Sequence, residues 1–120
     1  MEPQTTPTQD IENDTECCTS PVATEANAIA TDVQLLSALG NDTRYEALRL
    51  IAGSNEGVCV CQLQPALGVS QGAVSQALSR LHSAGLVTRR KEGRWRYYSA
   101  TPAAEQLLGT LDEIRGAVNE

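Results

Sequence analysis

The stretch Leu67–Gly85, LGVSQGAVSQALSRLHSAG, decides the fold expected for this chain. Gly68 is the residue type that ends helices, and Ser70 is the type that caps the start of the next one. Apolar residues then recur at the i, i+4 and i+7 spacing of one helix face, at Val74, Leu78 and Leu81. We expect this second helix to run to Ala84 and to stop at Gly85. Two helices joined by so short a turn predict a helix-turn-helix.

The opposite face of the second helix is uncharged, short and rich in hydrogen-bonding groups. Its residues are Gln71, Gly72, Ser75, Gln76, Ser79 and Ser83. A face that only meets solvent usually carries Glu and Lys, whereas Gln can contact base edges through two hydrogen bonds and Ser can donate or accept one. This helix is therefore expected to read the major groove of DNA. The candidate contacts are Ser70, Gln71, Ser75, Gln76, Ser79 and Arg80.

A basic hairpin is predicted directly after this helix. The strands are expected at Leu86–Arg90 and Trp95–Ser99, with Gly93 in the turn between them. Trp95, Tyr97 and Tyr98 are expected to stiffen the strands and to pack onto the helices. Read alone, the hairpin is a solvated surface feature; after a helix-turn-helix, it is better interpreted as a wing that holds phosphates. Its candidate phosphate contacts are Arg89, Arg90, Lys91, Arg94 and Arg96.

Total charge argues against nucleic-acid binding, but its distribution argues for it. The 120 residues carry a formal net charge of −6. Residues 1–69 hold two Arg and ten Asp or Glu, a balance of −8, and residues 101–120 have a balance of −3. Residues 70–100 hold six cations and one acid, a balance of +5. A phosphate backbone responds to local charge, so the basic stretch marks the nucleic-acid contact.

Two further helices are predicted to lie outside the DNA-binding unit. One runs from Ala26 to Gly40 and the other over Pro102–Val118, and each has an apolar stripe. A small domain cannot easily cover both stripes alone, so a homodimer through the first and last helices is expected; plain core helices are the alternative. A helix over Thr43–Ala52, capped by Asn41 or Asp42, lies between them.

The remaining sequence divides into an arm and one domain. Residues 1–24 lack apolar periodicity and are expected to be a disordered arm carrying Cys17 and Cys18. Residues 25–120 are expected to be the DNA-binding and dimerisation domain. The fold class is α+β and mostly α: a winged helix-turn-helix with a β-hairpin wing.

The four cysteines form two tight pairs, Cys17–Cys18 and Cys59–Cys61. The alternation in Val58–Cys61 predicts an extended segment with both thiols on one face. A helix is expected from about Gln62, because Pro65 is tolerated in a first turn. The thiols would then lie at a helix N-terminus, where the dipole favours thiolate. Small buried residues on an inner strand remain the alternative, as do chance cysteines in the arm.

The cellular compartment bears on how the thiols are used. The N-terminus has no basic segment followed by an apolar one, so no signal peptide is predicted. No apolar run approaches the ~20 residues that cross a bilayer. We therefore expect a cytoplasmic protein with no membrane partner. Thiols stay reduced there, which favours metal or redox chemistry over a structural disulfide.

With these features in place, the sequence resembles the ArsR/SmtB family of metalloregulatory repressors over about Ala30–Glu113. The motifs are LLSALGNDTRYEALRLI, VCVCQLQPALGVSQGAVSQALSRLHSAGLV and KEGRWRYYS. The resemblance implies a dimeric winged-helix protein that binds double-stranded operator DNA and releases it on binding a metal or metalloid. No cofactor is implied for DNA binding itself.

The VCVCQL motif resembles the thiolate box that family members use for arsenite, antimonite, cadmium or lead. That box often has a third cysteine where this chain has Gln64. Some members supply cysteines from an N-terminal arm that reaches across the dimer, and ECCTS fits that role by resemblance. The implied metal ligands are Cys17, Cys18, Cys59 and Cys61. A second family site, a zinc site of Asp and His on the last helix, is not expected, because the only histidine is His82 on the recognition helix.

Several functions remain open at this point. The first is a repressor whose inducer is As(III) or Sb(III), with Cd(II) or Pb(II) as the alternative; three thiolates suit arsenite, and a four-sulfur site is not excluded. The second keeps the DNA-binding module and makes the thiols a redox switch. A thiol oxidoreductase is not expected, because an acid–base partner beside the thiols is lacking. A constitutive architectural DNA-binding protein is the last alternative.

Overall fold

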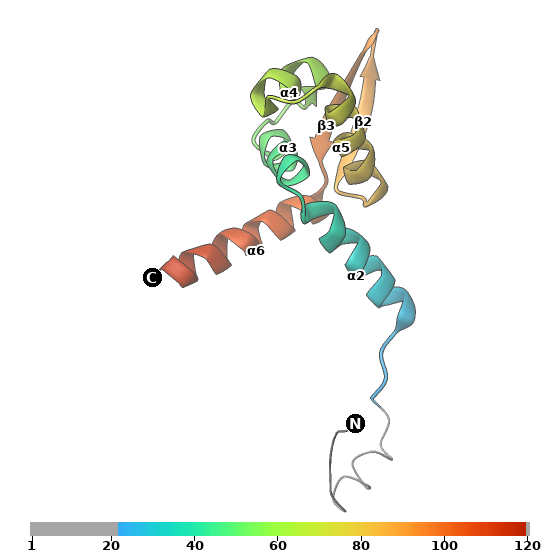
Figure 1. Cartoon of the computed structure of the whole chain (residues 1–120), viewed down its shortest axis with the longest axis vertical. Helices are drawn as coiled ribbons and strands as arrows, with labels where there is room; N and C mark the ends of the chain where they lie inside the picture. Colours follow the sequence, from blue (N-terminus) through green and yellow to red (C-terminus); the bar gives the residue numbers. More distant parts are fainter. Residues whose placement is uncertain (1–21, 120) are drawn as a thin grey trace, which may run out of the picture.

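The computed structural model describes residues 22–119 (Figure 1). The predicted arm, residues 1–24, lies almost wholly outside the described residues. The elements in chain order are α2 (Ala26–Leu39), α3 (Asp42–Ala52), β1 (Val58–Cys59), α4 (Val60–Leu67), α5 (Gln71–Ser83), β2 (Val87–Glu92), β3 (Trp95–Ala100) and α6 (Pro102–Asn119).

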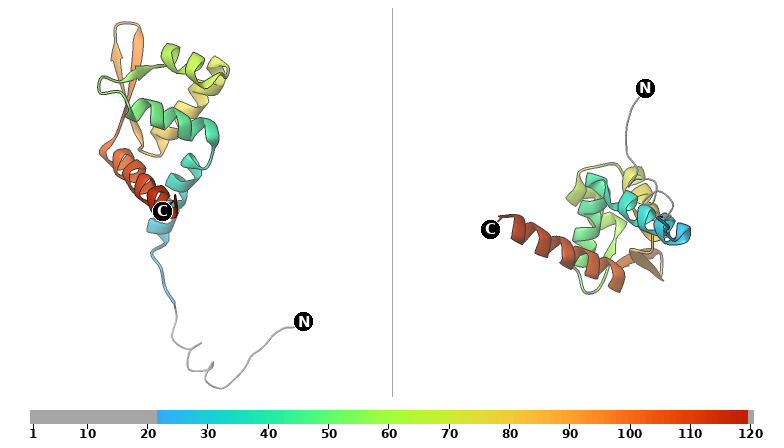
Figure 2. Two further views of the ribbon diagram at one scale, coloured as in Figure 1. Left: turned by 90° about the vertical axis from the view of Figure 1, so that its left-hand side faces the viewer. Right: turned by 90° about the horizontal axis from the view of Figure 1, so that it is seen from below.

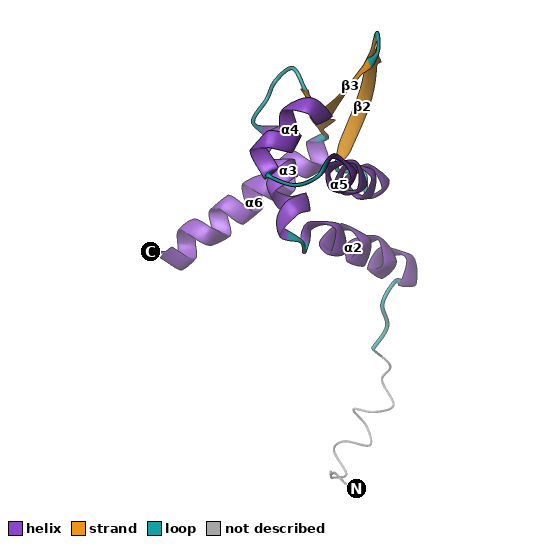
Figure 3. Cartoon of the chain, turned by 45° about the horizontal axis from the view of Figure 1, so that its top comes forward, coloured by secondary structure: helices purple, strands orange, loops and turns teal. Residues whose placement is uncertain are grey.

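The sheet is small and sits beside a cluster of three helices. Its strand order is β1-β3-β2, and both pairings are antiparallel. Figure 3 shows β2 and β3 extending as a hairpin past α5, while α3, α4 and α5 pack together. The parts of α2 and α6 nearest the chain ends project from this body in different directions (Figures 1 and 2). The arrangement is a winged helix-turn-helix, which confirms the predicted fold class.

One apolar core joins the helix-turn-helix to the wing. Val74, Leu78 and Leu81 on α5 are 0–1% exposed, which confirms the predicted stripe. They meet Leu48 and Ile51 from α3 and Leu63 from α4 in the same cluster. Burying one such side chain fully contributes about 1.5–3 kcal/mol. These contacts fix α5 against its neighbours, so its polar face must point outward.

The turn between α4 and α5 has the predicted chemistry. Gly68 adopts a left-handed conformation at φ 69°, which a glycine does without a Cβ penalty. The side chain of Ser70 accepts a hydrogen bond from the Ala73 backbone N–H at 3.1 Å and so caps α5. The helix starts at Gln71 and ends at Ser83, as the sequence predicts to within one residue.

Two arginines of α3 hold the outer helices to the body. Arg44 donates to the carbonyls of Ala38 at 2.7 Å and Ser37 at 3.0 Å, and so satisfies the C-terminal end of α2. Arg49 donates to Asp112 of α6 at 2.8 Å and to the Tyr45 hydroxyl at 2.8 Å. The angle of each projecting helix is therefore tied to α3.

The Asp112 contact predicts an acid-dependent component of stability. Hydrogen bonds from Arg49 and then from Arg115 hold the pKa of Asp112 below its ordinary value. A carboxyl with a lowered folded-state pKa contributes stability that is present above its unfolded-state pKa and lost as pH falls through the folded-state pKa. In melting experiments from about pH 6 down to about pH 2.5, Asp112→Asn should flatten the fall of the melting temperature. The carboxylate side chain is 49% exposed, so the effect should be small.

Glu113→Gln provides the matched control, because it removes an exposed carboxyl from the next position of the same helix. A parallel loss of melting temperature in Asp112→Asn and the parent across this range would show that the ion pair contributes nothing.

The outer helices have the predicted bounds, and the hairpin bounds are shifted. The helix expected from Ala26 to Gly40 is α2, and the one over Pro102–Val118 is α6. The first strand runs two residues further into the turn than predicted, to Glu92, while the second begins at Trp95 as predicted, which leaves Gly93 and Arg94 as the turn. Tyr98 packs in the core, but Trp95 is 51% exposed, so the expectation that it packs onto the helices was wrong. Within residues 22–119 no helix has the length and apolar character needed to span a membrane.

Candidate nucleic-acid interface and thiol pair

The polar face of α5 is exposed as predicted. The exposed candidates are Ser70, Gln71, Ser75, Gln76, Ser79 and Arg80. Ser70 also caps the helix, so its oxygen is already engaged by the Ala73 N–H and its hydroxyl proton remains available to a ligand. The buried stripe lies on the other side of the same helix. The face therefore has the exposure and the chemistry that contact with base edges requires.

A groove beside α5 adds residues that sequence reasoning missed. Gln76, Ser79 and Arg80 line it together with residues from the start of α3. The added residues are Asn41, Thr43 and Arg44. Asn41 caps α3 by accepting a hydrogen bond from the Arg44 N–H at 3.0 Å, and Arg44 is committed to α2. Among the described contacts, the side chain of Thr43 makes no hydrogen bond of this kind. No spacing in the sequence indicates that it lies beside α5.

Strand register divides the wing cations between two faces. Arg89 pairs with Tyr98, Arg90 with Tyr97, and Lys91 with Arg96. Alternate residues of a strand share a face, and directly paired residues lie on the same face. Arg89, Lys91 and Arg96 therefore share the face that carries Tyr98, and Arg90 lies on the other face.

Arg90 is also engaged within its own chain. Its Nε contacts Glu92 at 3.2 Å, its Nη2 donates to the Glu56 carbonyl at 3.4 Å, and its guanidinium lies 5.2 Å from the centroid of the Tyr97 ring. The sequence grouped Arg90 with the other wing cations. These contacts make Arg90 a support for the wing, but its side chain is still 49% exposed, so it stays among the predicted phosphate contacts with the exposed Arg89, Lys91, Arg94 and Arg96.

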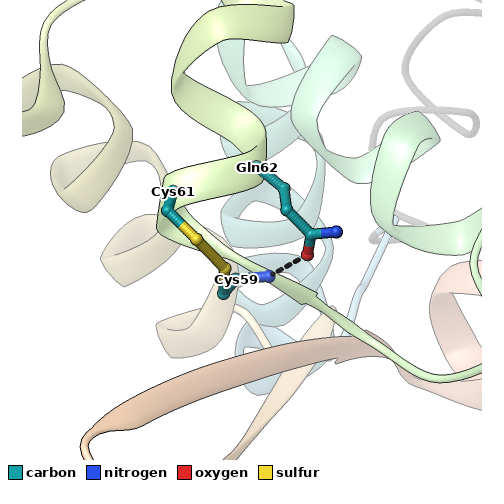
Figure 4. Close-up of a disulfide and its surroundings, with 3 residues drawn as sticks. All are labelled: Cys59, Cys61 and Gln62. Carbon is teal, nitrogen blue, oxygen red and sulfur yellow. Dashed lines mark hydrogen bonds between the residues drawn. A yellow bond between two sulfur atoms is a disulfide. The ribbon is translucent and has the colours of Figure 1, made fainter.

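The thiol pair lies where β1 becomes α4 (Figure 4). The predicted extended segment over Val58–Cys61 was wrong in its bounds, because the strand ends at Cys59 and the helix begins at Val60. Pro65 consequently lies inside α4 and not in its first turn. Sequence alone cannot separate these cases, since one short apolar run fits either element.

The two sulfurs still meet, for a different reason from the one predicted. Cys59 is the N-cap of α4 and is 5% exposed, while Cys61 lies in the first turn and is exposed. A cap residue has an extended backbone, so its side chain turns back toward the first turn. Here the Cα atoms are 5.4 Å apart and the sulfurs are joined as a disulfide. Gln62 Oε1 accepts a hydrogen bond from the Cys59 N–H at 3.0 Å and fixes the cap.

The thiol pair and the wing line one groove of about 490 Å³. Its other members are Val60, Gln64, Gln71, Lys91, Arg94, Trp95 and Arg96. Gln71 is the first residue of α5, so the groove joins the thiols, the recognition helix and the wing cations. The sequence separates Cys61 from Lys91 by thirty positions, and nothing in its pattern indicates that the two residues line one groove.

The described residues supply two of the predicted sulfur ligands. Among residues 22–119, no group of three or more His, Cys, Asp or Glu side chains is placed to hold a metal ion. Cys17 and Cys18 lie outside the described residues. His82 is exposed on α5 and is not among the residues that line the groove at the thiol pair. Within one chain, three or more sulfurs are available only if Cys17 or Cys18 takes part.

A third groove lies between the projecting helices and is mainly apolar. It is lined by Leu36, Leu39, Gly40, Tyr45, Leu107, Leu111, Ile114 and Arg115. The stripe on α2 continues from it with Ile29 at 45%, Val33 at 56% and Leu36 at 68% exposure. On α6, Ile114 and Val118 are 54% and 77% exposed. Contiguous apolar surface of this kind marks an interaction site.

Comparison with known proteins agrees with this architecture. Residues 41–89 match the family described as "Bacterial regulatory protein, arsR family". A putative arsenical resistance operon repressor ArsR2 from Halobacterium salinarum is 64% identical over 100 residues, which are 83% of this chain and 84% of that protein. Arsenic resistance transcriptional regulator ArsR1 from Pseudomonas putida is 35% identical over 76% of this chain and 69% of its own length.

Solved structures also match this fold. The crystal structure of NolR from Sinorhizobium fredii superposes with a TM-score of 0.71 at 32% identity, and the match covers 81% of this chain and 97% of that one. The two arsenic-resistance relatives are named as a repressor and a transcriptional regulator, so the chain groups with regulatory proteins and not with enzymes. The shared sequence, the helix-turn-helix and the wing together establish that the chain belongs to the ArsR family of regulatory proteins.

Proposed function

We propose that this protein is a repressor that leaves its operator when the reduced thiols bind As(III) or Sb(III). One observation carries the proposal: Cys59 and Cys61 meet at the start of α4, and the end of α4 leads directly into α5. Relatives named as arsenical resistance repressors support the choice of metalloid. A protein that acts on operator DNA is expected to work in the cytoplasm, where thiols are kept reduced.

The inducer site needs a third sulfur. Once reduced, Cys59 and Cys61 offer two thiolates, whereas arsenite takes three and Cd(II) or Pb(II) takes three or four soft ligands. We assign the third to Cys17 or Cys18 of the partner protomer. The α2 end that carries the arm lies at the opposite end of the molecule from α4 and the wing (Figures 1 and 2). That separation favours an arm from the other protomer.

The dimer that this site requires is proposed to form through α2 and α6. The exposed apolar residues of these two helices flank one apolar groove. Leaving them in water is unfavourable, and a dimer interface would bury them. A two-fold axis there would present two copies of α5 to half-sites one DNA turn apart, about 34 Å.

Coupling between the two sites is proposed to pass through α4. This helix has eight residues, it anchors in the core through Leu63, and only Gly68 to Ser70 separate it from α5. A third sulfur drawn to its first turn changes its position relative to the dimer axis, and α5 moves with it. By linkage, the inducer must bind the DNA-free form more tightly than the DNA-bound form by the same factor by which it weakens DNA binding. Such coupling free energies are typically about 1–3 kcal/mol.

DNA recognition is proposed to divide between α5 and the wing. Gln71, Ser75, Gln76 and Ser79 contact bases, Ser70 and Arg80 border them, and Arg89, Lys91, Arg94 and Arg96 hold phosphates. Arg90 supports the wing from its other face.

The Gln76→Ala variant should lose about 1–3 kcal/mol of specific DNA binding and relax the preference at one base position. The reason is the loss of one side chain that can form two hydrogen bonds with a base edge. Arg94→Ala is the matched comparison, because it should weaken all sequences alike and lower the slope of affinity against salt by about one unit. Fluorescence anisotropy on operator and scrambled duplexes at several salt concentrations separates the two. An unchanged sequence preference in Gln76→Ala would remove α5 from base readout.

The experiment that tests the function is release of the reduced, full-length protein from its own promoter DNA. Separate titrations use As(III), Sb(III), Cd(II), Pb(II), Zn(II) and peroxide. We expect release at the lowest concentrations for As(III) and Sb(III), and none for Zn(II). Release by Cd(II) or Pb(II) at lower concentrations than As(III) would reassign the inducer, and no release by any of these metals would reject the proposal.

The bonded sulfurs of Cys59 and Cys61 favour a second candidate, a thiol redox sensor of the same fold. Peroxide would convert the two thiols to this disulfide and be reduced to two waters. Excess reductant should abolish a peroxide signal and preserve the As(III) response. Repeating the titration with excess reductant therefore separates the two candidates.

A further inference from the structure

The groove at the thiol pair is strongly cationic on its wing side. Lys91, Arg94 and Arg96 line it opposite Cys59 and Cys61, and all three cations are exposed. The described residues that line it include no carboxylate to offset them. An anionic segment held at the thiols would therefore lie against the same cations that the wing offers to DNA.

The arm has such a segment beside its cysteines. Asp10, Glu12, Asp14 and Glu16 occupy alternate positions of DIENDTE, directly before Cys17. Residues 1–21 contain five acids and no Lys or Arg. In an extended chain, alternate residues project to one side, about 7 Å apart, so such a chain presents a single row of carboxylates.

We propose that residues 10–16 of one protomer dock on the wing of its partner when the inducer joins Cys17 or Cys18 to Cys59 and Cys61. The segment then competes with DNA phosphates for Lys91, Arg94 and Arg96. The inference rests on the proposed cross-protomer site and adds a direct means of release to the movement of α4. Inducer binding thus converts a distant acidic segment into a local competitor.

Tethering supports this occupant. Cys18 is joined to the start of α2 by eight residues, which span at most about 28 Å when extended. Glu16 adjoins Cys17, so a sulfur bound at Cys61 brings this carboxylate into the groove that Arg96 lines. Tethering raises the effective concentration of the acidic row to the millimolar range. Weak individual ion pairs, each about 0.2–1 kcal/mol at exposed positions, then act together.

The test neutralises the row and leaves every thiol in place. The variant is D10N/E12Q/D14N/E16Q. The control is D32N/E46Q/E105Q/E113Q, which removes the same charge from exposed positions on α2, α3 and α6, none of which lines the groove. For each full-length reduced protein, we would measure operator affinity with and without sodium arsenite and the As(III) affinity from thiolate–arsenic absorbance.

Trp95 gives a direct readout of docking. It is the single tryptophan, it is 51% exposed, and it lines the groove. Arsenite should reduce acrylamide quenching of its fluorescence in the parent and in the control, because the docked segment covers it. The neutralised variant should show little such protection.

We expect the neutralised variant to bind As(III) as tightly as the parent, while arsenite weakens its DNA binding at least threefold less than it does for the parent and the control. Equal weakening in all three proteins would overturn the docking proposal and leave the proposed function intact. Release that persists unchanged in Cys17→Ser/Cys18→Ser would overturn it too, since the arm would then not be held at the wing. A parent that arsenite does not release from DNA would overturn both.

Discussion

Cys59→Ser and Cys61→Ser should each abolish release of operator DNA by As(III) while leaving DNA binding without inducer near that of the parent. Each change removes one of two sulfurs that the fold holds together at the start of α4. The remaining thiolate and one arm sulfur give two ligands, one short of the three that arsenite takes. Release at the arsenite concentration that frees the parent should fall below detection.

The fold itself should tolerate both substitutions. Serine is a preferred N-cap residue, so position 59 keeps a side chain suited to the start of α4. Cys61 is exposed, and surface substitutions usually change stability by less than about 0.5 kcal/mol. Circular-dichroism melts and operator affinity without inducer check this point. Loss of DNA binding in the absence of inducer would mean that serine disturbs α4 itself.

Val60→Ala is the matched control, because it alters the residue between the two thiols and keeps both. It should remain inducible. Cys17→Ser/Cys18→Ser should behave like the single variants, since it removes the third ligand. Mixed dimers of one protomer without arm thiols and one without Cys59 and Cys61 should retain one working cross-site. Induction of Cys59→Ser at the parental arsenite concentration would contradict the thiol assignment.

The helix-turn-helix could be predicted because local chemistry and the global fold agree there. Gly68 needs a positive φ, Ser70 supplies a cap, and the stripe at Val74, Leu78 and Leu81 is buried. Each signal is local and each favours the same helix. The α2 and α6 stripes were read correctly for the same reason, because helical periodicity is visible over several turns.

The thiol segment shows where this reasoning fails. Val58–Cys61 has four residues, too few for a period of 2 to be separated from a helix start. The extent of the strand is set by its pairing with β3, which involves only Val58 with Tyr98 and Cys59 with Tyr97. Strand β3 lies about forty positions away in the sequence. The inference that the thiols meet survived, because the cap geometry also brings their sulfurs together.

Contacts between distant segments could not be predicted. The face of the wing on which Arg90 lies depends on strand register. The register places Arg90 beside Glu92 and Tyr97 and on the opposite face from Lys91. The groove shared by Cys61 and Arg96 exists only because β3 lies between β1 and β2. Residue types identify candidates for metal and phosphate contact, and tertiary packing decides which of them share a surface.

Leu36→Glu should convert the dimer to monomers and lower specific operator affinity by about two orders of magnitude. Leu36 is 68% exposed and lines the apolar groove between α2 and α6. A carboxylate there would be desolvated without a partner in the proposed interface, which is costly. Two half-sites bound by one dimer gain from a high effective concentration, and a monomer loses that gain.

Thr31→Glu is the matched control, because it adds the same charge at an exposed position on the far side of α2 from the stripe of Ile29, Val33 and Leu36. It should remain dimeric. Sedimentation at micromolar concentration measures the association, and anisotropy on single and paired half-sites measures DNA binding. A dimeric Leu36→Glu protein with parental affinity for paired half-sites would place the interface elsewhere.

The same substitution tests whether the inducer site spans two protomers. A monomer keeps Cys59 and Cys61, but the arm that would supply its third sulfur belongs to the partner. Leu36→Glu should therefore bind As(III) more weakly than the parent at micromolar protein, although no thiol has changed, and Thr31→Glu should bind it normally. Raising the concentration of Leu36→Glu should restore affinity as dimers re-form by mass action. Parental As(III) affinity in a monomeric Leu36→Glu protein would instead mean that each chain completes the site with its own arm.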